Sequence, residues 1–494
     1  MKVSIFFSST LRARAPKLAA ALCLMLAAAL ASVCARSPVA LARQQPSQSE
    51  QKSLSKKDRD RGLDMLKTVK DDLKEFYYDP NIRGMDLDAR FKVAEDRVRQ
   101  ANSNGEIFSI IAGLLVELND SHTYFIPPVR MTKVDYGWRM QMIGDKCYVV
   151  DVVAGSDAER KGMKAGDEVW SIDGFEPTRE NLWKIKYSYY VLRPRQGMRV
   201  VLQDPEGRQR ELAVMAKFDP QTPVLFWEKK KKKDEEAEPP PFYEPGGGVI
   251  IWKMASFAVP EKEVDEALKR VRPFKSLVLD LRGNGGGYEK TLLRMLGYFF
   301  DRDVKLGDIR RRRGTRQLVA KSQGGRAFAG RLVVLVDSNS ASAAELFART
   351  IQLEKRGTIL GDRSSGKVMR SMLHGEAAER GTFDYFTFVP FAVSVTDADI
   401  TMSDGKGLEG EGVAPDELVL PTHDDLARGL DPVLSRAAAL AGTSLDPRQA
   451  GALFPRLRKS AVGESESDED KDDKDSKDDK NGKDSKDDKD KKKG

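Results

Sequence analysis

Apolar residues recur every three or four positions through the first third of the chain. Leu63, Leu66 and Val69 begin this spacing, which continues through further apolar residues as far as Val116. Such spacing places apolar side chains on one face of a helix. We therefore predict an N-terminal helical domain over residues 57–128, closed by the stretch DSHTYFIPP.

The pattern changes to short β-like runs over residues 135–218. The runs CYVVDVV, DEVWSIDG and MRVVLQD are separated by Gly and Asp turn signals, which predicts a compact β-rich module. Over residues 249–445, apolar strands such as VIIWKMASF, SLVLDLRG and RLVVLVD alternate with helical runs. This order predicts an α/β domain with a partly parallel sheet, so the predicted fold class is multi-domain α/β.

Two segments lack the apolar positions that a core needs. Residues 227–248 combine blocks of like charge with prolines and glycines, which is typical of a linker or a long surface loop. Residues 463–494 alternate Asp and Lys without apolar residues, which predicts disorder. The lysine run 229–233 leaves open an RNA or membrane-surface binder, but acidic residues follow it at once and favour a solvated loop.

The N-terminus has the pattern of a secretory signal. Basic residues precede the apolar run LAAALCLMLAAALAS, which is too short to span a membrane comfortably, and small residues follow it. We predict that residues 1–42 are removed, with cleavage after Ala42; cleavage after Ala35 and a lipid anchor on Cys34 are the alternatives. The mature chain would be periplasmic or extracellular, with no membrane span.

Charge and composition exclude several classes of partner. The chain has 83 basic and 76 acidic residues, but removal of the signal takes away five basic residues and leaves 78 against 76. This balance gives no reason to expect nucleic acid. Beyond the signal only Cys147 remains, and the three histidines have no ligand-like spacing, so we predict no disulfide, metal or cofactor.

The stretch SNSASAAE, Ser338 to Glu345, lies between the apolar run RLVVLVD and a helical run. A serine at such a turn can simply cap the helix. A nucleophile also explains the small neighbours, because they leave room for a substrate backbone, and free N–H groups at a helix N-terminus stabilise an oxyanion. Ser342 is the candidate.

Two further loops are expected at the same sheet edge. If Thr358–Leu360 pairs in parallel with the strand before Ser342, the loop GDRSSGK brings Lys367 beside that serine. SLVLD is followed by RGNGGG, whose glycines allow close backbone approach. These glycines lack the dinucleotide and P-loop fingerprints, so oxyanion binding fits them better than phosphate binding.

Several motifs, in this order, resemble those of the C-terminal processing (tail-specific) serine peptidases, a family that includes the tricorn core protease. The motifs are DSHTYFIPP, AERKGMKAGDEVWSIDG, DLRGNGGG, SASAAE and LEGEGVAPD, and the resemblance covers roughly residues 60–445. It implies a PDZ-like domain at 135–218 and a serine peptidase domain at 249–445.

The resemblance implies that Ser342 is the nucleophile and that the N–H groups of Gly286 and Ala343 bind the oxyanion. In the processing peptidases a lysine is the general base, and Lys367 matches it. Those enzymes usually carry a Gln four residues later, where this chain has Ser371. A lysine base needs burial to lower its pKa.

The tricorn-like branch implies a second solution. There a Ser-His pair and a distant Glu assist the nucleophile, and Ser121, His122 and Glu409 match them. A histidine needs no large pKa shift to act as a base. The loop geometry slightly favours Lys367 as the base, and His122 with Ser121 and Glu409 is kept as the alternative. The PDZ resemblance implies peptide binding by strand addition, for which we select Gly137, Trp138, Arg139 and Met140.

Together these observations predict an exported serine endopeptidase that acts on unfolded or extended polypeptides and needs no cofactor. The alternative is a catalytically inactive peptide-binding scaffold of the same fold. The presence of Ser371 in place of the usual Gln, and of two candidate bases, motivates this alternative. The sequence leaves the oligomeric state open.

Overall fold

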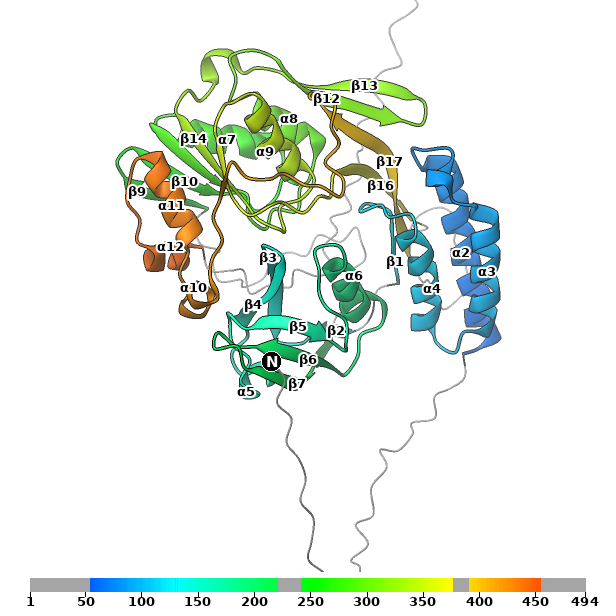
Figure 1. The fold of residues 1–494 in the computed structure, drawn as a ribbon. Coiled ribbons are helices and arrows are strands. Elements are labelled where there is room, and N and C mark those ends of the chain that lie inside the picture. The colour runs from blue at the N-terminus through cyan, green and yellow to red at the C-terminus, as the bar shows by residue number, and fades with distance from the viewer. Residues whose placement is uncertain (1–53, 129, 131, 221–240, 376–390, 455–494) are drawn as a thin grey trace, which may run out of the picture. The chain divides into compact units, whose positions relative to one another are not determined.

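The computed structural model describes residues 54–128, 130, 132–220, 241–375 and 391–454 (Figure 1). The chain divides into the units Met1–Ser53 and Leu54–Gly494, and all described residues belong to the second. The predicted signal, residues 227–240 of the charged segment and the Asp/Lys tail lie outside the described residues. No helix among the residues described is long and apolar enough to cross a membrane.

Three helices form the N-terminal region: α2 (Lys56–Phe76), α3 (Leu87–Gln100) and α4 (Asn104–Val116). Each begins at a residue whose side chain accepts a backbone N–H, namely Ser55, Asp86 and Ser103. A short turn of 3-10 helix, η1 (Ile82–Gly84), joins the first two. The apolar faces of the three helices share one core with Phe125, Val393 and Val395, which lie on strands described below.

The next module is a five-stranded antiparallel sheet in the order β3-β4-β5-β6-β7. Its strands are β3 (Trp138–Ile143), β4 (Lys146–Val152), β5 (Glu168–Ile172), β6 (Gly197–Gln203) and β7 (Gln209–Met215). The helices α5 (Asp157–Arg160) and α6 (Leu182–Lys186) and the π-helix η2 (Tyr187–Leu192) accompany it. A two-stranded ribbon, β2 (Thr132–Asp135) and β8 (Lys217–Pro220), connects its ends.

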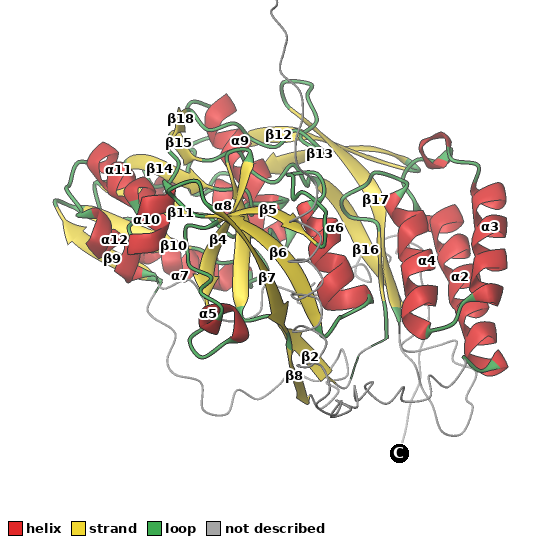
Figure 2. Ribbon diagram, turned by 60° about the horizontal axis from the view of Figure 1, so that its bottom comes forward, coloured by secondary structure: helices red, strands yellow, loops and turns green. Residues whose placement is uncertain are grey.

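A six-stranded sheet forms the centre of the largest region, in the order β18-β15-β14-β11-β10-β9 (Figure 2). The strands are β9 (Phe242–Gly246), β10 (Val249–Lys253), β11 (Ser276–Asp280), β14 (Arg331–Val336), β15 (Thr358–Gly361) and β18 (Glu417–Leu418). All neighbours pair in parallel except β9 with β10. The predicted mixed α/β fold with a partly parallel sheet is therefore confirmed.

Helices cover both faces of this sheet because the buried strands are apolar on both sides. Leu277 and Leu279 point into one core, to which α7 (Glu261–Val271), α8 (Glu289–Leu296) and α9 (Ala343–Leu353) contribute. Val278 points into the other core, with α11 (Pro432–Ala441) and α12 (Pro447–Leu453). The short helices η3 (Gly324–Arg326) and α10 (His423–Arg428) lie in connections.

A second sheet links the helical region to the α/β region. It contains β1 (Tyr124–Ile126), β12 (Val304–Arg311), β13 (Gly314–Ala320), β16 (Met369–Gly375) and β17 (Ala392–Met402). The long strand β17 pairs with β1, β12 and β16, all antiparallel. The sheet therefore brings the segment after α4 close to the segment after β15.

Candidate active site

Ser342 lies at the turn between β14 and α9, immediately before the first residue of the helix. Its backbone has φ 54° and ψ −119°, a conformation that non-glycine residues rarely adopt. A strained strand-to-helix turn of this kind presents a nucleophilic hydroxyl above a sheet edge. The N–H of Ala343 has no acceptor among the described residues, as expected for the first N–H of a helix.

The glycine-rich loop after β11 lies directly against Ser342. The N–H of Ala341 donates to the carbonyl of Asn284 at 2.9 Å. A Cβ on Gly286 would lie 2.7 Å from the Cβ of Ser342, so only glycine fits there. However, the N–H of Gly286 donates to Oδ1 of Asn284 at 2.9 Å. Of the two predicted oxyanion donors, therefore, only Ala343 has a free N–H.

The loop after β15 also reaches Ser342, as the parallel pairing of β14 and β15 predicts. The N–H of Ser342 donates to the carbonyl of Lys367 at 2.8 Å, and the N–H of Ser365 donates to the carbonyl of Ser340 at 2.9 Å. Backbone bonds thus fix the loop beside Ser342.

Glu345 organises this contact, a role that the sequence analysis did not assign. It is fully buried on α9, and its carboxylate accepts four hydrogen bonds. The donors are the N–H of Ser342 (3.0 Å), Oγ of Ser364 (2.6 Å), the N–H of Gly366 (2.7 Å) and the N–H of Lys367 (3.0 Å). Burial raises the pKa of Glu345, an effect that these four donors oppose. A Glu three residues after a helix-capping serine is the sequence signal that could have found it.

The side chain of Lys367 points to a different partner. Its Nζ lies 5.4 Å from the ring centroid of Trp183 on α6, a cation–π contact. Burial lowers its pKa, and the charge of Lys186 lowers it further. No hydrogen bond joins Nζ of Lys367 to Oγ of Ser342 within the described part of the chain. The structure therefore brings the predicted lysine to Ser342 by its backbone only.

Ser121, His122 and Glu409 form one hydrogen-bonded group, although 288 positions separate Ser121 from Glu409. Oγ of Ser121 lies 2.7 Å from Nδ1 of His122 and donates to Oε2 of Glu409 at 2.9 Å. The N–H of Ser121 also donates to this carboxylate, at 2.9 Å. Because the hydroxyl has one proton and gives it to Glu409, His122 must carry its proton on Nδ1. Nε2 is then free to accept a proton.

The same carboxylate connects this group to the nucleophile's loop. Oε2 of Glu409 accepts the N–H of Val368 at 2.8 Å, and Lys367, the residue before it, accepts the N–H of Ser342. A continuous set of hydrogen bonds therefore runs from Ser342 to His122.

The carboxylate of Asp120 holds the backbone of His122 in place. The N–H of His122 donates to Oδ1 of this buried carboxylate at 2.9 Å. Tyr77 and Thr396 donate to it through their hydroxyls, at 2.8 and 2.7 Å. Burial lowers the pKa of His122 to about 4; the charge of Asp120 opposes this shift and that of Lys367 adds to it. The imidazole is therefore neutral at neutral pH.

The predicted peptide-binding residues, 137–140, lie at the start of β3. Other groups of the protein already contact them. The side chains of Trp138 and Met140 are buried in the core of the β-rich module, and Arg139 pairs with Asp135 at 3.0 Å. Gly137 has φ 75°, and a Cβ there would collide with Ser156. The carbonyl of Met140 on the outer edge of β3 accepts Nζ of Lys186 at 3.0 Å, so strand addition at this point requires Lys186 to leave.

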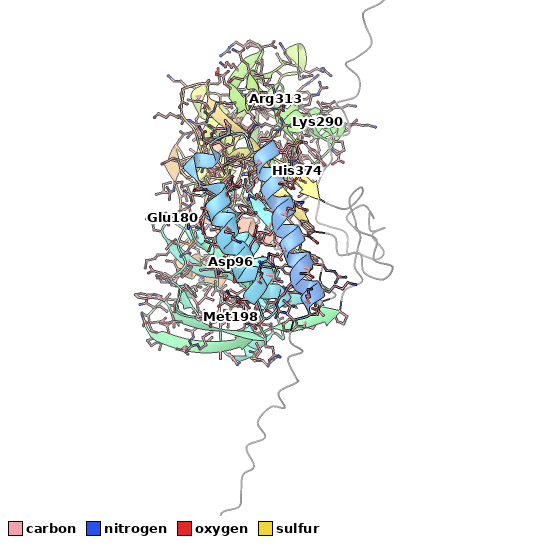
Figure 3. All side chains as sticks on the ribbon, turned by 90° about the vertical axis from the view of Figure 1, so that its right-hand side faces the viewer. Asp96, Glu180, Met198, Lys290, Arg313 and His374 are labelled. Atoms are coloured by element: carbon pink, nitrogen blue, oxygen red, sulfur yellow. The ribbon has the colours of Figure 1, made fainter. Side chains whose placement is uncertain are left out.

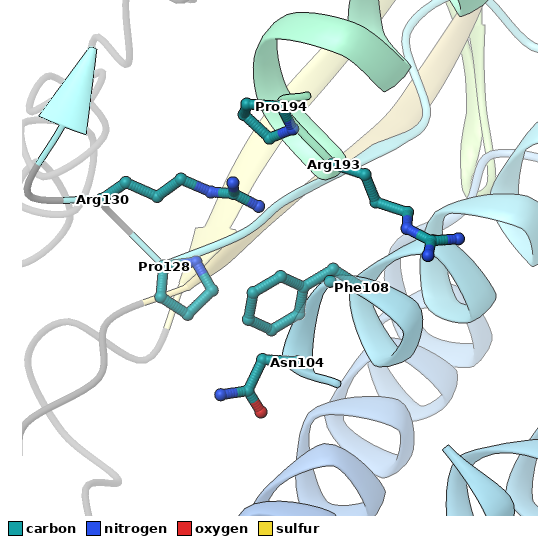
Figure 4. A pocket seen from close by; sticks show the side chains of 7 residues that line it. Asn104, Phe108, Pro128, Arg130, Arg193 and Pro194 are labelled. Atoms are coloured by element: carbon teal, nitrogen blue, oxygen red, sulfur yellow. The ribbon is translucent and has the colours of Figure 1, made fainter. Parts of the chain in front are cut away.

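A pocket of about 540 Å³ lies away from these groups, lined by Asn104, Gly105, Phe108, Pro128, Arg130, Arg193 and Pro194 (Figure 4). None of the predicted site residues lines it. In the part of the chain that the structure describes, no group of three or more His, Cys, Asp or Glu residues could hold a metal ion.

By sequence, the chain is similar to known peptidases. Residues 248–419 match the family model described as "Peptidase family S41". The chloroplastic carboxyl-terminal-processing peptidase 1 of Arabidopsis thaliana is 23% identical over 345 residues, which cover 66% of this chain and 65% of that protein. The carboxy-terminal processing protease CtpA of Bacillus subtilis (strain 168) is 20% identical over 336 residues, which cover 66% of each chain.

The chain thus spans just under two thirds of the length of these two relatives. A solved structure described as "Crystal Structure of mature CPAF" is 15% identical, with a TM-score of 0.56 over 75% of this chain and 94% of the other. That likeness shows a shared fold. Residues 248–419 of this chain are therefore similar to peptidase family S41.

Proposed function

We propose that this protein is a serine endopeptidase that cleaves polypeptides through an acyl-enzyme on Ser342, with His122 as the general base. The observation that carries the proposal is the Ser121 hydroxyl held between Nδ1 of His122 and the carboxylate of Glu409. The family match and the relatives named as C-terminal processing peptidases support the reaction class.

In the proposed reaction, Nε2 of His122 takes the hydroxyl proton of Ser342 while Oγ attacks the scissile carbonyl carbon. The N–H of Ala343 at the start of α9 stabilises the oxyanion. Nε2 then gives the proton to the leaving amine, and a water molecule hydrolyses the acyl-enzyme by the reverse sequence. Glu409 stabilises the imidazolium through Ser121, which keeps Nδ1 protonated throughout.

Gly286 would supply the second oxyanion donor. Its N–H must first leave Oδ1 of Asn284, to which it donates at 2.9 Å. A developing negative charge is a stronger acceptor than a neutral amide oxygen, which favours this exchange.

Lys367 acts electrostatically in this mechanism. Its charge lowers the pKa of His122 and so favours the neutral imidazole. Burial lowers the pKa of Lys367 itself, and this direction keeps the Ser-Lys mechanism as the competing assignment. The orientation of Nζ toward Trp183 favours His122.

The wider functional proposal has two further parts. The β-rich module, residues 135–218, would bind an extended or C-terminal segment of the substrate at β3 once Lys186 releases Met140. Export would follow from the signal-like pattern in residues 1–42, which lie outside the described residues.

The test is cleavage of an unfolded reporter protein by the full chain and by Ser342→Ala, His122→Ala and Lys367→Met variants, with a fluorophosphonate probe to label an activated serine. We expect labelling and cleavage to vanish with Ser342 and with His122, and to persist in Lys367→Met. If the wild-type protein neither cleaves nor labels while all variants fold, the peptidase proposal is wrong and the scaffold alternative replaces it.

A further inference from the structure

Strand β16 follows the catalytic loop and has one unpaired edge. It begins at Met369, two residues after Lys367, and within the described residues it pairs only with β17. The pairings of β16 with β17 overlap in residue number with those of β1 and of β12. A strand has only two edges, so β1 and β12 occupy the opposite edge of β17. The outer edge of β16 is therefore bare in the part of the chain described.

The hydrogen bonds of Thr396 show which groups of β16 point outward. Its N–H donates to Oγ1 of Thr123 at 3.1 Å, and its carbonyl accepts the N–H of Tyr78 at 3.0 Å, both on the side of β17 away from β16. Ser371 stands opposite Thr396, so this is a non-hydrogen-bonded pair, and the N–H and carbonyl of Ser371 point away from β17. By alternation, those of Leu373 do the same.

The side chains of Ser371 and Leu373 lie on the face of the sheet that carries His122. Oγ of Ser394 donates to the carbonyl of His122 at 2.6 Å and lies 3.0 Å from Oγ of Ser371, whose hydroxyl can donate to it. Leu373 stands opposite Ser394, and opposed residues share a face. Its side chain is 39% exposed although it is apolar.

The opposite face of β16 packs on the helical region. His374, which is labelled in Figure 3, stacks on Phe76 with ring centroids 4.0 Å apart. Met372 stands opposite Val395, which lies in the core of the helical region, so Met372 shares this face. It is 43% exposed, close to the value for Leu373, and so provides a matched control.

An unpaired strand edge with exposed apolar side chains is a liability that proteins usually cover or blunt. An extended polypeptide can cover both, because its backbone can pair with the strand edge and every second side chain can contact the exposed apolar side chains. The proposed substrate is such a polypeptide, and β16 is continuous with the loop that touches Ser342.

We propose that substrate binds as an added strand along the outer edge of β16, pairing with Ser371 and Leu373, and that Leu373 selects an apolar substrate side chain. The catalytic part of this inference rests on the proposed function. Leu373 is thus a specificity-determining residue of the same site.

The first experiment removes an outward N–H. Because the N–H of Leu373 points away from β17, Leu373→Pro loses no bond within the sheet. We expect kcat/KM for an unfolded reporter to fall about three- to tenfold, the contribution of one hydrogen bond, with fluorophosphonate labelling of Ser342 unchanged. Met372→Ala should leave both quantities unchanged. An unaltered kcat/KM in a folded Leu373→Pro protein would overturn the inference.

A second experiment leaves the backbone of β16 intact. Leu373→Ala should lower the preference for an apolar over a polar side chain at one substrate position about tenfold, and Leu373→Asp should reverse it. Single N-methyl groups placed along a peptide substrate should impair cleavage at alternate positions only, without any change to the protein. Uniform effects along the peptide, or a specificity profile that Leu373→Asp does not alter, would contradict strand addition.

Failure of the peptidase proposal is distinguishable from failure of this one. If the wild-type protein is inactive, the same N-methyl series is measured as the Kd of a fluorescent peptide for Ser342→Ala. If the Kd rises only for N-methyl groups at alternate peptide positions, and if this pattern is lost in the double variant Ser342→Ala, Leu373→Pro, strand addition at the outer edge of β16 is supported. Equal affinities throughout would reject it.

Discussion

Removing the hydroxyl of Ser121 tests the proposed base most directly. Ser121→Ala deletes the acceptor for Nδ1 of His122, at 2.7 Å, and the donor to Glu409, at 2.9 Å. The hydroxyl of Ser342, the imidazole of His122 and the carboxylate of Glu409 all remain. The imidazole can then rotate, and Glu409 no longer stabilises the imidazolium that forms in the transition state.

The magnitude follows from the bonds that are lost. A hydrogen bond to a charged group contributes about 1.5–3 kcal/mol, and each 1.4 kcal/mol is about a tenfold change in rate. We expect kcat to fall about ten- to hundredfold, with KM within about twofold because Ser121 does not lie on the proposed substrate strand. Steady-state cleavage of a fluorogenic unfolded polypeptide measures both constants.

The pH profile of kcat/KM separates the two candidate bases. A His122 base is active when neutral, so activity should be full at neutral pH and fall as the pH drops through the His122 pKa of about 4. The charge of Lys367 lowers that pKa, so Lys367→Met should raise it and move the acid limb to higher pH. Loss of all activity in Lys367→Met, or wild-type activity in Ser121→Ala, would refute the reasoning.

Three further outcomes are expected. Glu345→Ala removes the acceptor of four hydrogen bonds, and of the four donors the N–H of Ser342 keeps the carbonyl of Lys367 as a second acceptor; the change should lower the free energy of unfolding by about 3 kcal/mol or more, measured by urea titration, and an unchanged midpoint would contradict this. Gly286→Ala places a Cβ 2.7 Å from that of Ser342 and should abolish cleavage, whereas Gly283→Ala, also at positive φ but with no atom within 4 Å, should retain it. The pKa of His122 is about 4 in the folded protein and 6.5 in the unfolded one, so its contribution to stability is complete above pH 6.5 and is lost as the pH falls toward 4. A His122→Gln protein should lose less stability over that range, by up to about 3 kcal/mol.

Local sequence patterns were sufficient to predict strands of the central sheet and the loops that lie beside Ser342. The apolar runs gave β11, β14 and β15, and parallel pairing of such strands puts their carboxyl ends at one edge. That rule alone places the loop of Lys367 and the glycine-rich loop beside Ser342, because each loop directly follows one of these strands.

Side-chain direction could not be predicted in the same way. Spacing limits how far Lys367 reaches, but the contact with Trp183 depends on how α6 of the β-rich module packs. The same holds for Lys186 on the carbonyl of Met140 and for Asn284 on the N–H of Gly286. Trp183 contacts the amine that the sequence analysis assigned as a candidate base, and Lys186 and Asn284 bond to groups that it assigned to substrate and oxyanion.

By itself, the sequence determined the mixed α/β fold class and predicted the strand-to-helix turn at Ser342 and the two sets of candidate bases, because these follow from periodicity and ordered motifs. Only the tertiary structure decided that Ser121 joins His122 to Glu409 and that the outer edge of β16 has no strand partner among the described residues. The physical reason is that hydrogen bonds and strand edges are properties of residues far apart in the chain, and β17, which pairs with β1, β12 and β16, brings them together.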